Sequence, residues 1–290
     1  DAGADEIAAL FAGLRGAPTP GLFWGTFYQA NLDYGIPENL FAGIRGAPAP
    51  DMFRETFYNM GIYYEEHRRI PSGLFAGIRG APAERMFMDT FSSAQQIEGE
   101  IPEDLFSGID GVPAESMFEG TFRGCAGITG SIPENLFAGV RGAPAKRMFA
   151  ETFGWRLTDA VTENNIGLSG EIPENLFAGI VGAPAEGMFD STFGNVSQLT
   201  GTIPARLFAG ISGAPAPYMF NQTFAGCTHL VGMLPSGFFA GISGAAAPYM
   251  FNRTFMDTLL TSFGDGIFGD LSGAATDGMF TKTFDTGGYA

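Results

Sequence analysis

The stretch LFAGIRGAPAPDMFRETF at residues 40–57 decides how this chain is organised, because it recurs along the whole length with its internal spacing unchanged. The shared unit reads L-F-x-G-I-x-G-A-P-A-x-x-M-F-x-x-T-F, and its copies begin 29 to 40 residues apart. Nine copies start at Leu10, Leu40, Leu74, Leu105, Leu136, Leu176, Leu207, Phe238 and Ile267. A period near 31 residues is typical of a repeat protein, so we expect a single repeat domain over residues 1–290.

The phenylalanines follow the same period. The chain has 29 of them, and 27 occupy the three phenylalanine positions of the nine copies. A single copy cannot bury three large rings by itself, whereas stacked copies can pack each ring on its equivalents. We therefore expect three columns of rings, and we assign the phenylalanines to the core rather than to function.

Within one copy, the pattern predicts a short strand and two short helices. Apolar and polar residues alternate in Ile97–Ile101 and Leu199–Ile203, which is typical of a strand. The I-P-E-N-L-F segment predicts a short helix or 3₁₀ turn, and M-F-x-x-T-F places apolar side chains on one helix face. The sequence thus predicts an α/β solenoid with a parallel sheet. An all-α solenoid is the alternative, which 43 glycines disfavour because glycine is unfavourable inside helices.

Two short motifs resemble known families. The segment GLSGEIPENL at residues 167–176 resembles half of a plant-type leucine-rich repeat, and TFRGCAGITG at residues 121–130 resembles part of the BspA-like bacterial surface repeats. The L-x-x-L-x-L-x-x-N strand of leucine-rich repeats is absent, and the G-A-P-A segment fits neither family. The resemblance implies a leucine-rich-repeat-like stack, an extracellular or cell-surface location, and no catalytic residues.

Composition and motifs exclude several classes of function. The 31 acidic and 15 basic residues give a net charge of −16, which opposes nucleic-acid binding. The chain has no run of 18 apolar residues, so we expect no membrane insertion. Motifs for nucleotide binding, hydrolysis or zinc proteolysis are absent, so we expect no enzyme.

Cysteine and histidine positions offer no cofactor or metal site. Cys125 and Cys227 stand at one unit position three copies apart, too far for a disulfide, and we expect both to be buried free thiols. His67 and His229 are isolated from each other in the sequence. We therefore expect neither a cofactor nor a bound metal.

The variable return segments between copies are the candidate binding sites, because insertions in repeat proteins map to loops on one face. The two longest are residues 58–69 and 154–171. They carry the tyrosine, tryptophan and arginine types that are enriched at interfaces, together with neighbouring polar residues. The candidates are Tyr58, Tyr63, Tyr64, His67, Arg68, Arg69, Trp155, Arg156 and Asn164. They predict an adhesion or protein-binding scaffold for a protein or surface glycan, although drift in unconstrained loops would give a similar composition.

One unit position is basic in several copies. Arg15, Arg45, Arg79 and Arg141 share it. They form either a cationic stripe for an acidic partner or a solvated column without a function. We favour the second interpretation, because Asp110 interrupts the column and uncharged residues follow it.

The two ends of the chain suggest an alternative function. Residues 283–290 hold the close of one unit, and residues 1–10 hold the complementary start. Joined between neighbouring subunits, they would nearly complete one more copy. Such a contact propagates, so the alternative is a structural subunit of a stalk or filament that assembles head to tail. A piece of a longer array would show the same pattern.

Overall fold

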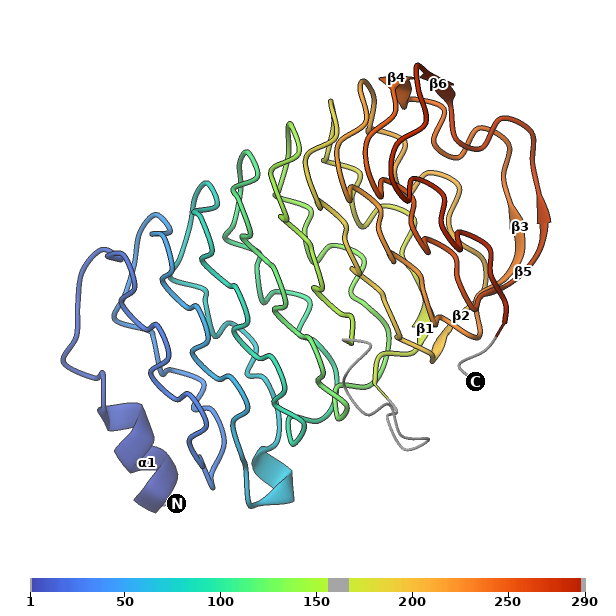
Figure 1. Ribbon diagram of the computed structural model, residues 1–290. Helices are drawn as coiled ribbons and strands as arrows, with labels where there is room; N and C mark the ends of the chain where they lie inside the picture. Colours follow the sequence, from blue (N-terminus) through green and yellow to red (C-terminus); the bar gives the residue numbers. More distant parts are fainter. Residues whose placement is uncertain (1, 156–166, 288–290) are drawn as a thin grey trace.

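The computed structural model describes residues 2–155 and 167–287. Successive copies of the sequence unit lie side by side along an elongated molecule, and helix α1 lies beside the first copy (Figure 1). Regular secondary structure is sparse in the described residues. Its elements are α1 (Ala2–Ala9), the 3₁₀ helix η1 (Glu65–His67), β1 (Gly170–Glu171), β2 (Leu199–Thr200), β3 (Val231–Leu234), β4 (Ser243–Ala245), β5 (Leu259–Phe263) and β6 (Asp270–Ser272).

The strands form three small parallel sheets, which pair β1 with β2, β3 with β5, and β4 with β6. Elsewhere, isolated parallel bridges join one copy to the next, as between Gly46 and Ile78 and between Gly80 and Ile109. Each sheet therefore arises where two consecutive copies run side by side. Continuous sheets do not extend along the part of the chain that the structure describes.

The expected α/β solenoid of strand-plus-helix repeats is wrong, and so is the all-α alternative. Across the described ranges, the only helices are α1 and η1, and neither lies within the recurring unit. The unit therefore has none of the helices that its sequence predicts, and a leucine-rich-repeat or solenoid description does not fit this architecture. The reason lies in the backbone of the M-F-x-x-T-F segment.

That segment turns at every fourth residue instead of forming a helix. Asp51, Glu55 and Asn59 all have positive φ, at 54°, 54° and 48°. A right-handed helix cannot pass through such residues. The chain forms overlapping turns instead, in which the Thr56 N–H donates to the Phe53 carbonyl at 3.2 Å. A four-residue turn period returns apolar side chains to one side at i, i+1, i+4 and i+5, which is the spacing that we interpreted as a helix face.

The remaining N–H groups of the segment bond to the next copy. The Phe53 N–H donates to the Met86 carbonyl at 2.8 Å, and the Phe57 N–H donates to the Thr90 carbonyl at 2.8 Å. Backbone donors thus alternate between closing a turn and joining two copies. This ladder satisfies the buried backbone without helices or continuous sheets, which meets the requirement that buried N–H groups be paired.

Phenylalanine rings at equivalent positions stack on one another through the core. The ring centres of Phe53 and Phe87 lie 5.6 Å apart with an interplanar angle of 4°, and those of Phe57 and Phe91 lie 5.4 Å apart at 8°. All four side chains are fully buried. Each ring contributes about 2–3 kcal/mol by burial, and each stacked pair adds about 1 kcal/mol. The rings therefore hold consecutive copies in register.

A close approach between copies explains one recurring glycine. A Cβ atom added at Gly43 would lie 2.0 Å from the Leu14 carbonyl oxygen of the preceding copy. The equivalent contact at Gly77 would be 2.3 Å, from the Ile44 carbonyl. The glycine after L-F-x is thus required by contact between backbones rather than by flexibility.

Candidate binding surface

The return segment at residues 58–69 is fixed onto the stack at several points. Ile62 within it and Ile70 directly after it are buried in the core. Arg68 holds the segment together, since its guanidinium donates to the carbonyls of Ile62 and Tyr63 and to the Glu98 carboxylate at 2.8 Å. The segment is therefore a defined loop rather than an unanchored insertion.

Four rings gather on this segment and its neighbour in the first copy, and we call them the tyrosine cluster: Tyr34, Tyr63, Tyr64 and His67. Tyr63 and Tyr64 meet edge to face at 5.0 Å, and Tyr34 lies 5.0 Å from Tyr64 and 5.8 Å from His67. The hydrogen bond to the Tyr64 side chain raises the pKa of Tyr34 above its usual value. Tyr63 is 73% exposed and Tyr64 is 39% exposed. The cluster thus presents aromatic surface to solvent.

The other predicted residues of this segment, Tyr58, Arg68 and Arg69, have different surroundings. Tyr58 is half-buried and stacks on Tyr28 at 4.8 Å, so it supports the fold as well as the surface. Arg68 holds the loop in place through the hydrogen bonds described above. Arg69 is exposed and stands beside it in the chain. The structure therefore brings the tyrosines together and assigns Arg68 to positioning.

The second predicted segment gives a different result. Trp155 is only 8% exposed and belongs to the core, so it does not form an exposed anchor. Its N–H donates to the Gly194 carbonyl at 2.7 Å, which makes it part of the ladder between copies. Arg156 and Asn164 lie outside the described residues.

Three aromatic residues of the first copy were not among the predicted candidates. Tyr34 joins the tyrosine cluster, and Trp24 and Tyr28 are 52% and 46% exposed. The Arg54 guanidinium lies 4.5 Å from the centre of the Trp24 ring, and the Trp24 indole N–H donates to Glu55 at 3.3 Å. The sequence contained a signal for the exposure of Trp24. Its unit position carries the charged residues Arg54 and Glu119 in other copies, which indicates a position on the surface.

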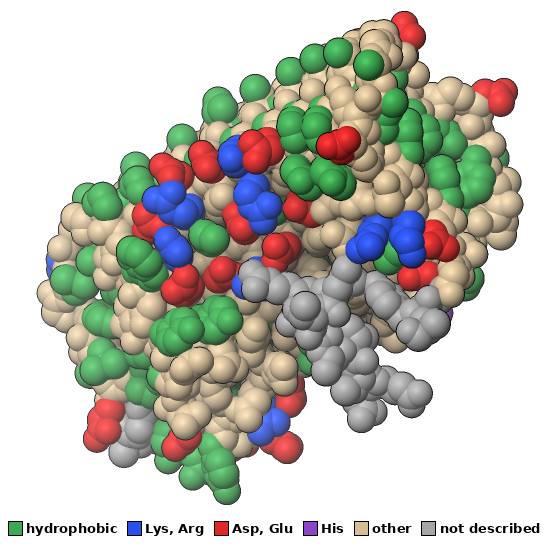
Figure 2. All heavy atoms as spheres, viewed as in Figure 1, with side chains coloured by type: hydrophobic (Ala, Val, Ile, Leu, Met, Phe, Trp, Pro, Cys, Tyr) green, Lys and Arg blue, Asp and Glu red, His purple; other side chains and the backbone are tan. Residues whose placement is uncertain are grey.

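Charged side chains form a network across the M-F-x-x-T-F segments. Figure 2 shows acidic and basic groups intermingled on the face in view. Arg85 binds Asp51 at 2.8 Å, which lowers the pKa of that carboxyl. Arg123 binds Asp89 at 2.7 Å, and Arg147 binds Glu119 at 2.8 Å. Because every one of these pairs joins two copies, the network is mainly structural.

Asp89 is the most perturbed carboxyl of this network. Burial is the main cause that raises its pKa to about 6, with Arg123 acting in the opposite direction and the carboxylates of Glu151, Glu119 and Glu55 acting in the same direction as burial. The attraction of Arg123 is thus too weak to offset the effect of desolvation on the pKa of Asp89. Such a group is a pH-sensitive element of the stack.

The cysteines are buried and free, as the sequence predicts. The Cys125 thiol donates to the Phe91 carbonyl at 2.9 Å, and the Cys227 thiol donates to the Phe193 carbonyl at 3.0 Å. Burial raises the pKa of Cys125 to about 12 and that of Cys227 higher still. Both thiols therefore remain protonated, which does not suit a nucleophile.

Within residues 2–155 and 167–287, no group of three or more His, Cys, Asp or Glu side chains could hold a metal ion. Over the same residues, no helix has the length and apolar character needed to cross a membrane. Neither a family model, nor a curated protein, nor a solved structure matches the chain. The resemblance to BspA-like surface repeats therefore stays a prediction.

Proposed function

We propose that this chain is a non-enzymatic binding protein that engages a protein partner through the tyrosine cluster. The single observation that carries the proposal is the exposure of Tyr63 and Tyr64 on a loop that is anchored at both sides. In a chain that buries most of its phenylalanines, exposed tyrosines on a fixed loop favour a contact surface.

The chemistry of the cluster favours a protein partner. Tyrosine offers a large, rigid contact area with a hydroxyl at its edge, and it is enriched among the residues that dominate interface affinity. Arg68 and the buried Ile62 and Ile70 keep the loop in place before binding. A loop that is ordered in advance loses less conformational entropy on association. Exposed Arg69 adds a charge to the same loop.

The cellular location belongs to the same proposal. A cell-surface or extracellular adhesion role is supported only by the short motif at residues 121–130 that resembles BspA-like surface repeats. Protease accessibility of the protein on intact cells of its source, compared with lysed cells, tests this part. Protection on intact cells would contradict it.

The binding test uses a double variant, Tyr63→Ser with Tyr64→Ser. Purified extracellular-matrix and cell-surface proteins are screened against the immobilised wild-type chain, and every binder is measured against the variant by biolayer interferometry. We expect at least tenfold weaker binding, which is about 1.4 kcal/mol. Tyr218→Ser is the matched control, because Tyr218 is also 39% exposed but stacks on Tyr249 away from the cluster.

Three results would count against the proposal. One is the absence of any binder in the screen. Another is a binder whose affinity the double variant leaves unchanged. The third is an equal loss in the Tyr218→Ser control, which would show that exposed tyrosines act without regard to their place. Equal thermal unfolding midpoints of all three proteins exclude misfolding as the cause.

The polarity of the backbone ladder favours a second candidate function, head-to-tail assembly. The Phe87 N–H donates forward to Met117, and the Phe118 N–H donates forward to Met148, each at 3.0 Å. At these positions the donors face one side of each copy and the acceptors face the other, a polarity that a head-to-tail contact would continue. Sedimentation velocity over a hundredfold range of concentration tests this candidate, and a concentration-independent monomer would contradict it.

A further inference from the structure

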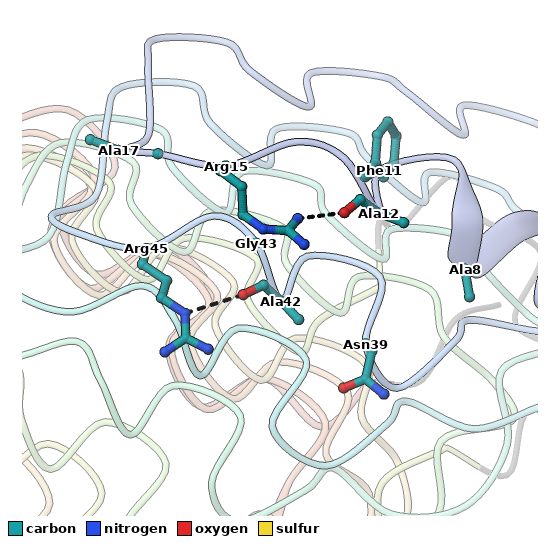
Figure 3. A pocket seen from close by; sticks show the side chains of 10 residues that line it. Ala8, Phe11, Ala12, Arg15, Ala17, Asn39, Ala42, Gly43 and Arg45 are labelled. Atoms are coloured by element: carbon teal, nitrogen blue, oxygen red, sulfur yellow. Dashed lines mark hydrogen bonds between the residues drawn. The ribbon is translucent and has the colours of Figure 1, made fainter.

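Three arginines stand side by side at one position of consecutive copies. Figure 3 shows Arg15 and Arg45 among the residues that line one hollow. The side chain of Arg15 donates to the Ala12 carbonyl, and Nε of Arg45 donates to the Ala42 carbonyl at 3.3 Å. Arg79 repeats this bond with the carbonyl of its own turn, at 3.2 Å. Each side chain is thus bonded to a carbonyl of its own turn, Arg45 and Arg79 through Nε and Arg15 through a terminal nitrogen.

These arginines lack a carboxylate partner in residues 2–155 and 167–287, although the chain has 31 acidic and 15 basic residues. Arg54, Arg68, Arg85, Arg123 and Arg147 are all ion-paired. These three neighbouring cations therefore have no charge partner among the described residues, although acids are in twofold excess. Repulsion between them is relieved when an anion binds from outside.

The arginines line two consecutive hollows. The first has a volume of about 650 Å³ and is lined by Arg15 and Arg45 together with Phe11, Asn39 and Ala42. The second has a volume of about 480 Å³ and lies between Arg45 and Arg79. Glu38 lines only the second hollow, so the first has cationic and amide groups without a carboxylate among its lining residues. Both volumes lie in the range of ligand sites.

We propose that this arginine column, Arg15, Arg45 and Arg79, binds an acidic glycan, with its main anion site between Arg15 and Arg45. Carboxylate and sulfate groups both accept the paired N–H donors of a guanidinium. The Phe11 ring in the same hollow offers an apolar contact to a sugar ring. This surface differs from the tyrosine cluster, and the proposal does not depend on a protein partner.

The spacing of the column favours a glycan over an acidic peptide. The Arg45 N–H donates to the Gly16 carbonyl at 2.9 Å and the Arg79 N–H to the Gly46 carbonyl at 2.8 Å. The backbones at the column are thus joined as in a parallel sheet, where neighbours lie ~4.8 Å apart. A pyranose unit advances a glycan by a similar length. Same-side groups of an extended peptide recur at ~6.8 Å, twice the rise per residue.

The net charge of −16 does not prevent this local attraction. At physiological ionic strength, exposed charges farther away than ~8 Å are largely screened. Distant acidic groups therefore have little effect at the first hollow, which Arg15 and Arg45 line. Binding should weaken steeply with added salt, because the attraction is between exposed charges.

The test compares two variants that change charge at the same unit position. In Arg15→Gln with Arg45→Gln, the proposed site is lost. In Arg141→Gln, an equivalent arginine is lost that is already paired with Asp110 at 3.5 Å. Fluorescent dextran sulfate and polygalacturonate are the probes, with neutral dextran and polyglutamate for comparison. At 50 mM salt, we expect about tenfold weaker binding of a charged glycan by the double variant.

Each outcome of this test supports or overturns the proposal. Binding of a charged glycan that the double variant loses and Arg141→Gln keeps supports it. No binding of either charged glycan, or an equal loss in both variants, overturns it. Tighter binding of polyglutamate than of the glycans indicates an acidic peptide instead. Should the double variant fail to fold, Asp110→Arg provides an independent measurement, because it extends the column to five arginines and should strengthen binding.

Discussion

The Thr90 hydroxyl donates a hydrogen bond to the Phe53 carbonyl at 2.9 Å, although the two residues are 37 positions apart. The same bond joins the unit threonine to the preceding copy at all eight junctions, from Thr56, Thr90, Thr121, Thr152, Thr192, Thr223, Thr254 and Thr283. Each threonine is almost fully buried. Threonine is thus required for its hydroxyl as well as its shape.

Replacing Thr90 with valine should therefore destabilise the chain although the volume is nearly unchanged. The lost bond is worth about 1 kcal/mol, and the Phe53 carbonyl keeps its bond from the Thr56 N–H. Urea unfolding followed by circular dichroism measures the change. Thr90→Ser keeps the hydroxyl and removes a methyl group, so it separates the two contributions. A Thr90→Val variant as stable as wild type would show that the threonine hydroxyl bonds do not contribute to stability.

Replacing Asp89 with asparagine should change how stability depends on pH. Burial raises the pKa of Asp89 to about 6 in the folded state, so the folded chain binds its proton more tightly than the unfolded chain does. Stability from this group is present at pH 4 and is lost as the pH rises toward 7, by about 3 kcal/mol.

The measurement is the free energy of unfolding at several pH values from 4 to 7 for wild type and Asp89→Asn. The difference between the two curves isolates Asp89, because the other carboxyls are common to both proteins. The variant should gain stability relative to wild type as the pH rises. Parallel curves would contradict the assignment, and Asp51→Asn is the control, since its pKa is lowered.

Replacing Gly43 with alanine should destabilise the chain by about 3 kcal/mol, because the added methyl group would overlap the Leu14 carbonyl. Gly13 stands at the same position of the first copy and has nothing within 4 Å of an added Cβ. Gly13→Ala should therefore be neutral or slightly stabilising. Differential scanning calorimetry compares both variants, and similar effects would show that contact between copies does not explain the glycine.

The two cysteines should resist thiol reagents while the chain is folded. Burial keeps their pKa far above neutrality, so the reactive thiolate is scarce and the reagent has no access. Ellman's reagent at pH 8 should label neither thiol within minutes, and it should label both after denaturation in guanidinium. Rapid labelling of the native chain would show that the core around Cys125 opens locally.

The sequence predicts the order of the copies and the columns of phenylalanine rings, because the need to bury these rings keeps both their spacing and their residue type constant from copy to copy. It does not reveal the turn geometry by periodicity, since a four-residue turn and a helix return apolar side chains at the same spacing. A local signal did exist. Glycine replaces the left-handed residues in some copies, at Gly21, Gly25, Gly120, Gly187 and Gly278, where a helix interior would disfavour it.

The candidate surface was predictable in part. Tyr63 and Tyr64 are exposed because they lie beyond the last position of the unit ladder, in residues without equivalents in other copies. Trp155 stands at the last ladder position, where the N–H bonds forward and the side chain turns into the core. Residue type alone does not separate these cases. The two hollows along the arginine column depend on the turn geometry, which the sequence did not predict.

The forward ladder of N–H donors has a mechanical consequence. Since its bonds join each copy only to the next, a force that pulls the two ends apart along the chain loads one junction at a time. The chain should yield in successive steps as copies peel away, rather than in one rupture. A released copy of about 31 residues at ~3.4 Å per residue adds ~100 Å of contour length. Single-molecule force spectroscopy should therefore record a regular sawtooth, with the step across residues 136–176 longer than its neighbours.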